Sequence, residues 1–182
     1  MGAALALALA VTVTVTACAG ARDASPAAAF ALLPPEQRPI SVVLPTDHGG
    51  HLDVSDYRGR ALLVLAFTTD NLLSQALLRN LEALAHAHRE DLAVVAMAGD
   101  PMTREEGESL VRTYAEVLNL HDVVMALATD EVREGDSALG RIERSPTLFL
   151  VNRAGVIARH VEGYLSRAQL EALVAPALPA RR

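Results

Sequence analysis

The sequence predicts a single α/β domain in which helices flank a mixed β-sheet. Apolar runs suited to strands buried on both faces occupy residues 61–67, 92–98 and 123–128, and segments of helical periodicity separate them. Further along, the turn residues 152–155 join two more apolar strands. Strands separated by helices run parallel and a hairpin runs antiparallel, so both kinds of pairing are expected in the sheet.

A β-hairpin is predicted ahead of the first buried strand. Residues 40–44 form a short β-branched and apolar run that ends at a proline, and residues 47–51 contain paired glycines that suit a turn. Residues 52–54 alternate between apolar and polar, as the second strand of a hairpin should. Residues 57–60 then predict a second turn, so the domain carries an N-terminal hairpin extension.

Two long helices are predicted after the first and second buried strands. The first begins near Asp70, with Asp70 or Asn71 as its N-cap. Its leucines recur at helical spacing: Leu73, Leu77, Leu81 and Leu84. The second follows Thr103, which is placed three residues before Glu106 as in a capping box, and it extends to Leu118.

The C-terminal part contains shorter elements. Residues 130–139 predict a short helix that ends at Gly140. Residues 147–151 and 156–161 predict the two strands of the final hairpin, and residues 166–174 predict the last helix, with its first serine as the cap.

The charge and cysteine content argue against several functions. The formal net charge is −6, and all sixteen basic residues are scattered arginines, so no nucleic-acid partner is expected. Cys18 is the only cysteine, so the domain can form neither an internal disulfide nor a zinc site built on thiolates. We also expect no bound cofactor.

The N-terminal residues predict an export signal and a lipid anchor. Residues 2–17 are uncharged and apolar, but the run is shorter than the roughly 20 residues of a membrane-spanning helix. Residues 1–17 therefore match a signal peptide. Residues 15–18 (VTAC) resemble the bacterial lipobox, which implies that Cys18 is lipidated. An uncleaved apolar anchor is the alternative interpretation.

The remaining boundaries follow from composition. Residues 18–39 are rich in Ala and Pro and predict a tether, within which residues 30–33 form an apolar piece that could pack on the domain edge. The domain then occupies residues 40–176, and residues 177–182 form a C-terminal tail.

Three separated segments occur in an order that is typical of one family of proteins. Residues 52–60 (LDVSDYRGR) provide the hairpin entry and a turn, residues 61–69 the central strand, and residues 145–155 (SPTLFLVNRAG) a proline loop, strand and turn. Together they resemble the thioredoxin-like family, specifically the membrane-tethered disulfide reductases called TlpA-like, which are related to the redoxins. The resemblance covers residues 41–174 and implies a thioredoxin-like fold.

The redox motif of that family is missing. Members carry Cys-x-x-Cys at the start of the first long helix, where the helix dipole and free amides lower the pKa of a thiol. Asn71 and Ser74 stand at these positions here. Neither an amide nor an unassisted hydroxyl can form the mixed disulfide or the sulfenic acid that the family's chemistry requires. We therefore expect no catalytic residue at this place.

The resemblance also implies a binding groove. Pro146 matches the family's cis-proline, which faces the active-site loop and helps to bind an extended peptide, so a cis Ser145–Pro146 bond is expected. A groove bounded by Asn71, Ser74, Ser145 and Pro146 could hold a peptide by edge-strand pairing without reacting with it. The alternative interpretation of Pro146 is a turn that begins a strand.

Two histidines are weak candidates for metal ligands. His48 and His51 flank paired glycines with H-x-x-H spacing, and an exposed turn with incidental histidines is the alternative. Related copper-delivery proteins use a cysteine pair with a histidine, and that pair is absent, so no metal site is expected. His86 and His88 are two residues apart and point to different helix faces.

Three hypotheses about function remain. The first is a redox-inactive binding or adaptor module in the cell envelope, outside the cytoplasm, which is held by a lipid at Cys18 and binds a protein or peptide near Pro146. The second is an oxidoreductase by descent that acts through a partner's thiols. The third is a metal carrier that uses His48 and His51.

Overall fold

The computed structural model describes residues 31–32 and 38–179. One sheet has six strands in the order β1-β8-β7-β4-β5-β6, and β2 and β3 form a separate hairpin. Three central strands run parallel: β4 (Ala61–Phe67), β5 (Leu92–Ala98) and β6 (Val123–Leu127). Two strands run antiparallel to their neighbours: β7 (Thr147–Val151) and β8 (Ile157–Glu162). The predicted mixed sheet is confirmed.

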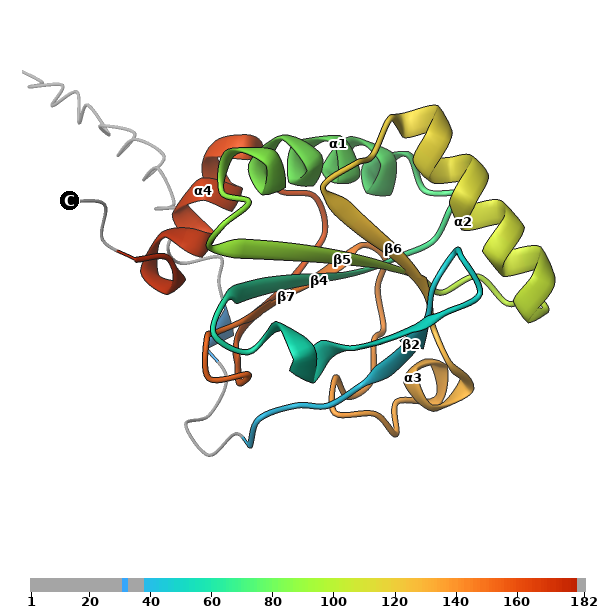
Figure 1. The fold of residues 1–182 in the computed structure, drawn as a ribbon, viewed down its shortest axis with the longest axis horizontal. Helices are drawn as coiled ribbons and strands as arrows, with labels where there is room; N and C mark the ends of the chain where they lie inside the picture. Colours follow the sequence, from blue (N-terminus) through green and yellow to red (C-terminus); the bar gives the residue numbers. More distant parts are fainter. Residues whose placement is uncertain (1–30, 33–37, 180–182) are drawn as a thin grey trace, which may run out of the picture.

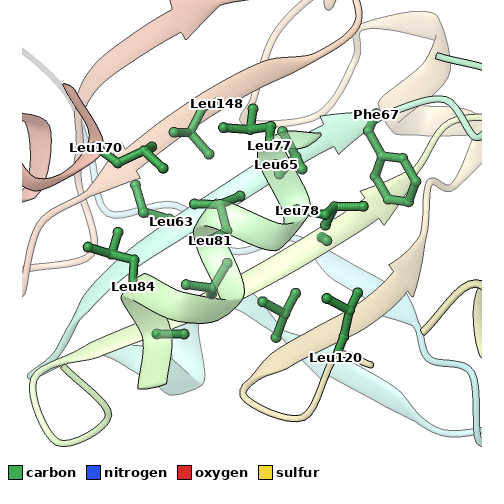
Figure 2. Close-up of a cluster of buried hydrophobic side chains, with 14 of the residues drawn as sticks. Leu63, Leu65, Phe67, Leu77, Leu78, Leu81, Leu84, Leu120, Leu148 and Leu170 are labelled. Carbon is green, nitrogen blue, oxygen red and sulfur yellow. The ribbon is translucent and has the colours of Figure 1, made fainter. Parts of the chain in front are cut away.

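Long helices cover one face of the sheet (Figure 1). They are α1 (Leu72–Ala87), α2 (Arg104–Leu118) and α4 (Arg167–Val174). Alternate residues of β4, namely Leu63, Leu65 and Phe67, belong to the core cluster under these helices. Figure 2 shows them together with Leu77, Leu81 and Leu84 of α1. These six side chains are at most 1% exposed, so this face forms a dry, leucine-rich core.

Short elements cover the opposite face. They are the hairpin of β2 (Val43–Pro45) and β3 (His51–Asp53), a 3-10 turn (Val54–Tyr57) and α3 (Asp130–Glu134). The other residues of β4, namely Leu62, Val64 and Ala66, belong to the core cluster on this side. The two-sided burial of β4 explains why its sequence is a continuous apolar run.

Two predicted boundaries are wrong. Helix α3 ends at Glu134 and not at residue 139, because Gly135 adopts a left-handed conformation with φ of 86° and terminates the helix. The first hairpin strand pairs over Val43–Pro45, not over residues 40–44. Ile40 and Val42 lie before the paired strand but are still buried, so their apolar character reports packing on the sheet.

Two residues of the segment predicted to be a tether are described, and they pair at the sheet edge. β1 (Ala31–Leu32) pairs antiparallel with β8, opposite Arg159 and His160. For residues 31–32 this pairing agrees with the prediction that residues 30–33 pack on the domain edge, whereas residues 30 and 33 lie outside the described residues. Among the helices within residues 38–179, none is long and apolar enough to cross a membrane.

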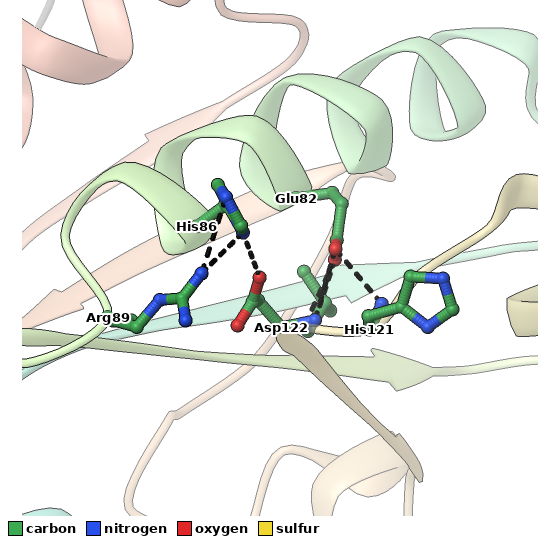
Figure 3. A network of polar contacts seen from close by, with 6 residues as sticks. Glu82, His86, Arg89, His121 and Asp122 are labelled. Atoms are coloured by element: carbon green, nitrogen blue, oxygen red, sulfur yellow. Dashed lines mark hydrogen bonds and ion pairs between the residues drawn. The ribbon is translucent and has the colours of Figure 1, made fainter.

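A polar network ties the C-terminal half of α1 to the start of β6 (Figure 3). The Glu82 carboxylate accepts backbone N–H groups of His121, Asp122 and Val123 at 3.0–3.1 Å. The Asp122 carboxylate lies 2.8 Å from the His86 ring. These bonds hold α1 against the sheet at the end away from Asn71, so both ends of the helix are fixed.

Candidate functional site

Asn71 caps helix α1 at the end of the loop that follows β4. Its backbone is extended, and its side-chain oxygen accepts the Leu73 N–H at 2.9 Å. The cap is therefore Asn71, and Asp70 does not take this role. Residues 71–74 occupy the first turn of the helix directly after the central strand, as the resemblance implied.

Hydrogen bonds join this helix start to the proline loop. The Asn71 side-chain amide donates to the Ser145 carbonyl at 2.8 Å. The Ser145 hydroxyl accepts the Thr68 N–H at 2.9 Å and lies 3.1 Å from the Thr68 hydroxyl. We call this set of bonds the loop clasp. It connects segments more than seventy residues apart in sequence and directly engages the backbone carbonyl that precedes Pro146.

Ser74 lies beneath the first turn of α1. Its side chain is 0% exposed, and its hydroxyl oxygen has no hydrogen-bond partner among the described residues. A buried hydroxyl without a partner is unfavourable, because it has lost its bonds to water. No histidine or carboxylate is hydrogen-bonded to Ser74 in this part of the chain, so nothing activates it as a nucleophile.

The Ser145–Pro146 peptide bond is cis, as the resemblance implies. The Pro146 carbonyl accepts the Gly163 N–H at 2.7 Å, which places the turn after β8 beside the proline loop. Next to Gly163, the Tyr164 side chain is 44% exposed. The structure thus brings Asn71, Ser145 and Pro146 together, while Ser74 lies under the surface.

The helix start also exposes apolar side chains. Leu72 is 75% exposed and Leu73 is 52% exposed, although both belong to the first turn of a helix whose other leucines are buried. Further along α1, Asn80 donates to the Tyr164 hydroxyl at 3.1 Å. Leu73 and Asn80 are seven residues apart and share a helix face, so Leu73 and Tyr164 border one surface.

Thr69 lies in the loop between β4 and α1, and it ties this loop to Asp100 and Tyr114. Its backbone N–H and hydroxyl both donate to the Asp100 carboxylate, at 3.2 and 2.9 Å. Its carbonyl accepts the Tyr114 hydroxyl at 3.4 Å. Burial raises the pKa of Tyr114 above its ordinary value of 10.0, and the charges of Asp100 and Asp70 act in the same direction. The phenol therefore stays protonated and can donate at neutral pH.

The histidine turn does not form a multidentate metal site. The His51 Nε2 atom lies 3.3 Å from an Arg104 guanidinium nitrogen, which can only donate, so this lone pair is engaged by a cation. His48 lies 3.5 Å from the Asp47 carboxylate. Among the residues that the structure describes, no group of three or more His, Cys, Asp or Glu could hold a metal ion.

Of the four predicted groove residues, Ser145 lines a hollow beside the clasp, and the rest of its lining was not predicted. A pocket of about 380 Å³ is lined by Thr68 and Ser145 together with residues of β4, β5 and the segment 128–144. No single motif marks it, because its lining comes from distant parts of the chain. A partial signal is the small residues Ala66, Gly99 and Ala128 at the ends of three neighbouring strands.

Solved structures support the fold. The thioredoxin-family thiol:disulfide interchange protein of Chlorobium tepidum is 20% identical, with a TM-score of 0.67 over 81% of this chain and 100% of its own. A DsbF homologue from Corynebacterium diphtheriae is 9% identical, with the same TM-score over 81% of this chain and 92% of its own.

The exposed lipoprotein thioredoxin of Streptococcus pneumoniae is 13% identical, with a TM-score of 0.61 over 75% of this chain and 98% of its own. No protein-family model matches the sequence, and no curated protein matches it either. At these identities the likeness establishes architecture. The chain has the thioredoxin-like fold, with Asn71 and Ser74 at the start of its first long helix.

Proposed function

We propose that this protein is a membrane-tethered thioredoxin-like domain that binds a protein or peptide outside the cytoplasm without thiol–disulfide chemistry. The observation that carries the proposal is the pair of hydrogen bonds made by the Asn71 side chain. Its side chain caps α1 and bonds the Ser145 carbonyl, so a structural bridge occupies the place where a thiolate would act. Ser74 offers no substitute, because its hydroxyl is fully buried.

The exposed surface around the clasp supports a binding role. Leu72, Leu73 and Tyr164 leave apolar area in water beside the cis-proline loop. Exposed apolar groups gathered on one surface are typical of protein interaction sites. Because the Ser145 carbonyl is already bonded to Asn71, we expect the partner to contact this apolar rim and not to pair with that carbonyl.

The envelope location is part of the proposal. The lipobox-like residues 15–18 support lipidation at Cys18, which lies outside the described residues. One of the similar structures is named as an exposed lipoprotein thioredoxin, and another as a thiol:disulfide interchange protein. Mass spectrometry of membrane-extracted protein should find acyl chains on Cys18 and none on the Cys18→Ala variant, whereas an unmodified Cys18 in the mature protein contradicts the tether.

Redox inactivity and partner binding need separate tests. The purified Cys18→Ala protein should reduce insulin with dithiothreitol no faster than dithiothreitol alone. For binding, a photo-reactive residue at Leu73 in native membranes should give a reproducible crosslinked protein. Val117 on α2 is 73% exposed and provides a matched control position. Equal crosslinking at both positions would reject the Leu73 surface as the binding site, and insulin reduction above background would reject the redox-inactive assignment.

A further inference from the structure

The pocket beside the loop clasp lies at the carboxyl ends of the parallel strands, on the hairpin side of the sheet. Its floor is apolar and includes Met97 and Val132, each at most 2% exposed. Small residues at the strand ends, such as Ala66 and Ala128, leave space that larger side chains would fill. In α/β sheets, ligands bind preferentially at this end of the strands.

One wall of the pocket contains two hydroxyl groups, of which one can still donate a hydrogen bond. Thr68 and Ser145 both line the pocket, and their hydroxyl oxygens lie 3.1 Å apart. One of the two hydroxyl protons makes the bond between them, whichever residue is the donor. The Ser145 oxygen is also an acceptor for the Thr68 N–H. The second hydroxyl proton remains available to a ligand oxygen.

The mouth of the pocket adds further donors. Arg133 bonds the Ala128 carbonyl and Asp130 at 2.6 Å each, and Arg144 lies 3.5 Å from the Glu162 carboxylate. A guanidinium carries five N–H groups, so both arginines keep donors beyond these contacts. Among residues 38–179, Glu143 is the one carboxylate in the pocket lining. The two arginines therefore bring N–H donors to an apolar hollow, although each also pairs with a carboxylate, Asp130 or Glu162.

We propose that this pocket binds a small amphiphile, an aliphatic chain that ends in a carboxylate. The chain would lie on the floor formed by Met97 and Val132, and the carboxylate would accept from the hydroxyl pair and from Arg144 at the mouth. A volume of about 380 Å³ lies in the lower part of the range of roughly 300–1,000 Å³ typical of small-molecule pockets, which restricts the ligand to a short chain. This site is independent of the proposed partner surface at Leu73.

The test uses octanoate below its micelle-forming concentration, with octanol as the uncharged comparison and acetyl-leucyl-leucine as a peptide carboxylate. Amide chemical shifts are recorded on the Cys18→Ala protein. Octanoate should shift the amides of residues 66–68, 97–99 and 142–145 in a saturable way. The Ala128→Leu variant fills the pocket and should abolish the shifts, whereas Ala76→Leu, at an exposed position of α1, should leave them unchanged.

Arg144→Met tests the carboxylate contact without touching the core, because Arg144 is 76% exposed. The substitution should lower the affinity for octanoate about tenfold and change the affinity for octanol little, because charge-assisted hydrogen bonds are stronger than neutral ones. It also provides a test if Ala128→Leu fails to fold. The proposal is overturned if octanoate causes no saturable shifts, if Arg144→Met leaves octanoate affinity unchanged, or if the peptide binds this pocket and octanoate does not.

Discussion

The two faces of the sheet are covered by different means, and two hollows lie beside the shorter cover. On one face, α1, α2 and α4 close a core of fully buried leucines (Figure 2). On the other face, a hairpin, the short helix α3 and the loop after it cover the apolar side chains (Figure 1). The pocket beside the clasp and a second one of about 230 Å³ are both lined by Ile142 of that loop.

The helix face is expected to contribute mainly to stability, and the opposite face to contain the candidate binding sites. Long helices can place a leucine over every apolar position of the strands, whereas a short helix and a loop leave gaps. The loop clasp lies at the boundary between the two faces, because Asn71 begins α1 and Ser145 lines the pocket. We therefore expect substitutions on the helix face to affect folding, and substitutions around the pocket to affect binding.

The largest expected effect distinguishes the two faces directly. Leu81→Ala on the helix face should lower the free energy of unfolding by about 3 kcal/mol, because it leaves a cavity in a closed core. Ile142→Ala, beside existing hollows, should cost less than about 1.5 kcal/mol. Urea denaturation monitored by circular dichroism measures both free energies of unfolding. Equal losses in the two variants would contradict the difference between the two faces.

The loop clasp should give the next largest effect. Asn71→Ala removes the N-cap and the bond to Ser145 and should cost about 1–2 kcal/mol. Asn71→Ser keeps a capping oxygen but loses the amide donor, so its cost should be smaller. If both variants unfold at the same urea concentration as the unchanged protein, the clasp is not a stabilising contact.

Two Ser→Ala changes should behave differently. The Ser166 hydroxyl caps α4 by accepting the Gln169 N–H, and the Ser166 N–H and hydroxyl donate to the Gln169 side-chain oxygen, so Ser166→Ala should cost about 1 kcal/mol. Ser74→Ala removes a buried hydroxyl without a partner and should be neutral or stabilising. Thermal unfolding of the pair provides the measurement, and a Ser74→Ala loss as large as that of Ser166→Ala would mean that the Ser74 hydroxyl has a partner.

The smallest expected effect concerns acid and the hairpin face. Burial would raise the pKa of Asp53, but hydrogen bonds from the Ser55 N–H and the Ser41 hydroxyl outweigh it, so the pKa lies below 3.8. A lowered folded-state pKa contributes stability above the unfolded value, and that contribution is lost as pH falls through the folded pKa. Amide protection factors in the hairpin, which correct for the intrinsic exchange rate at each pH, should therefore fall on acidification before those in α1 do. Asp53→Asn should reduce this dependence, and an unchanged pH profile would contradict the assignment.

Features encoded by neighbouring residues were predictable from the sequence. Thr103 and Glu106 form the predicted capping box, and β7 spans the predicted residues 147–151. The end of α3 could not be predicted from the sequence. Gly135 and Gly140 both adopt positive φ, and their sequence context does not show which one ends the helix. The Asn71–Ser145 bond and the pocket depend on the tertiary fold, which alone brings these distant segments together.

We propose that Asn71 and Ser74 occupy the positions of a lost redox pair in a scaffold that would otherwise support one. Introducing Asn71→Cys and Ser74→Cys together in the Cys18→Ala background tests it most directly. After mild oxidation, mass spectrometry should show an internal disulfide, and the reduced variant should reduce insulin above the rate of its parent. A folded double variant that keeps free thiols and no activity would contradict the claim.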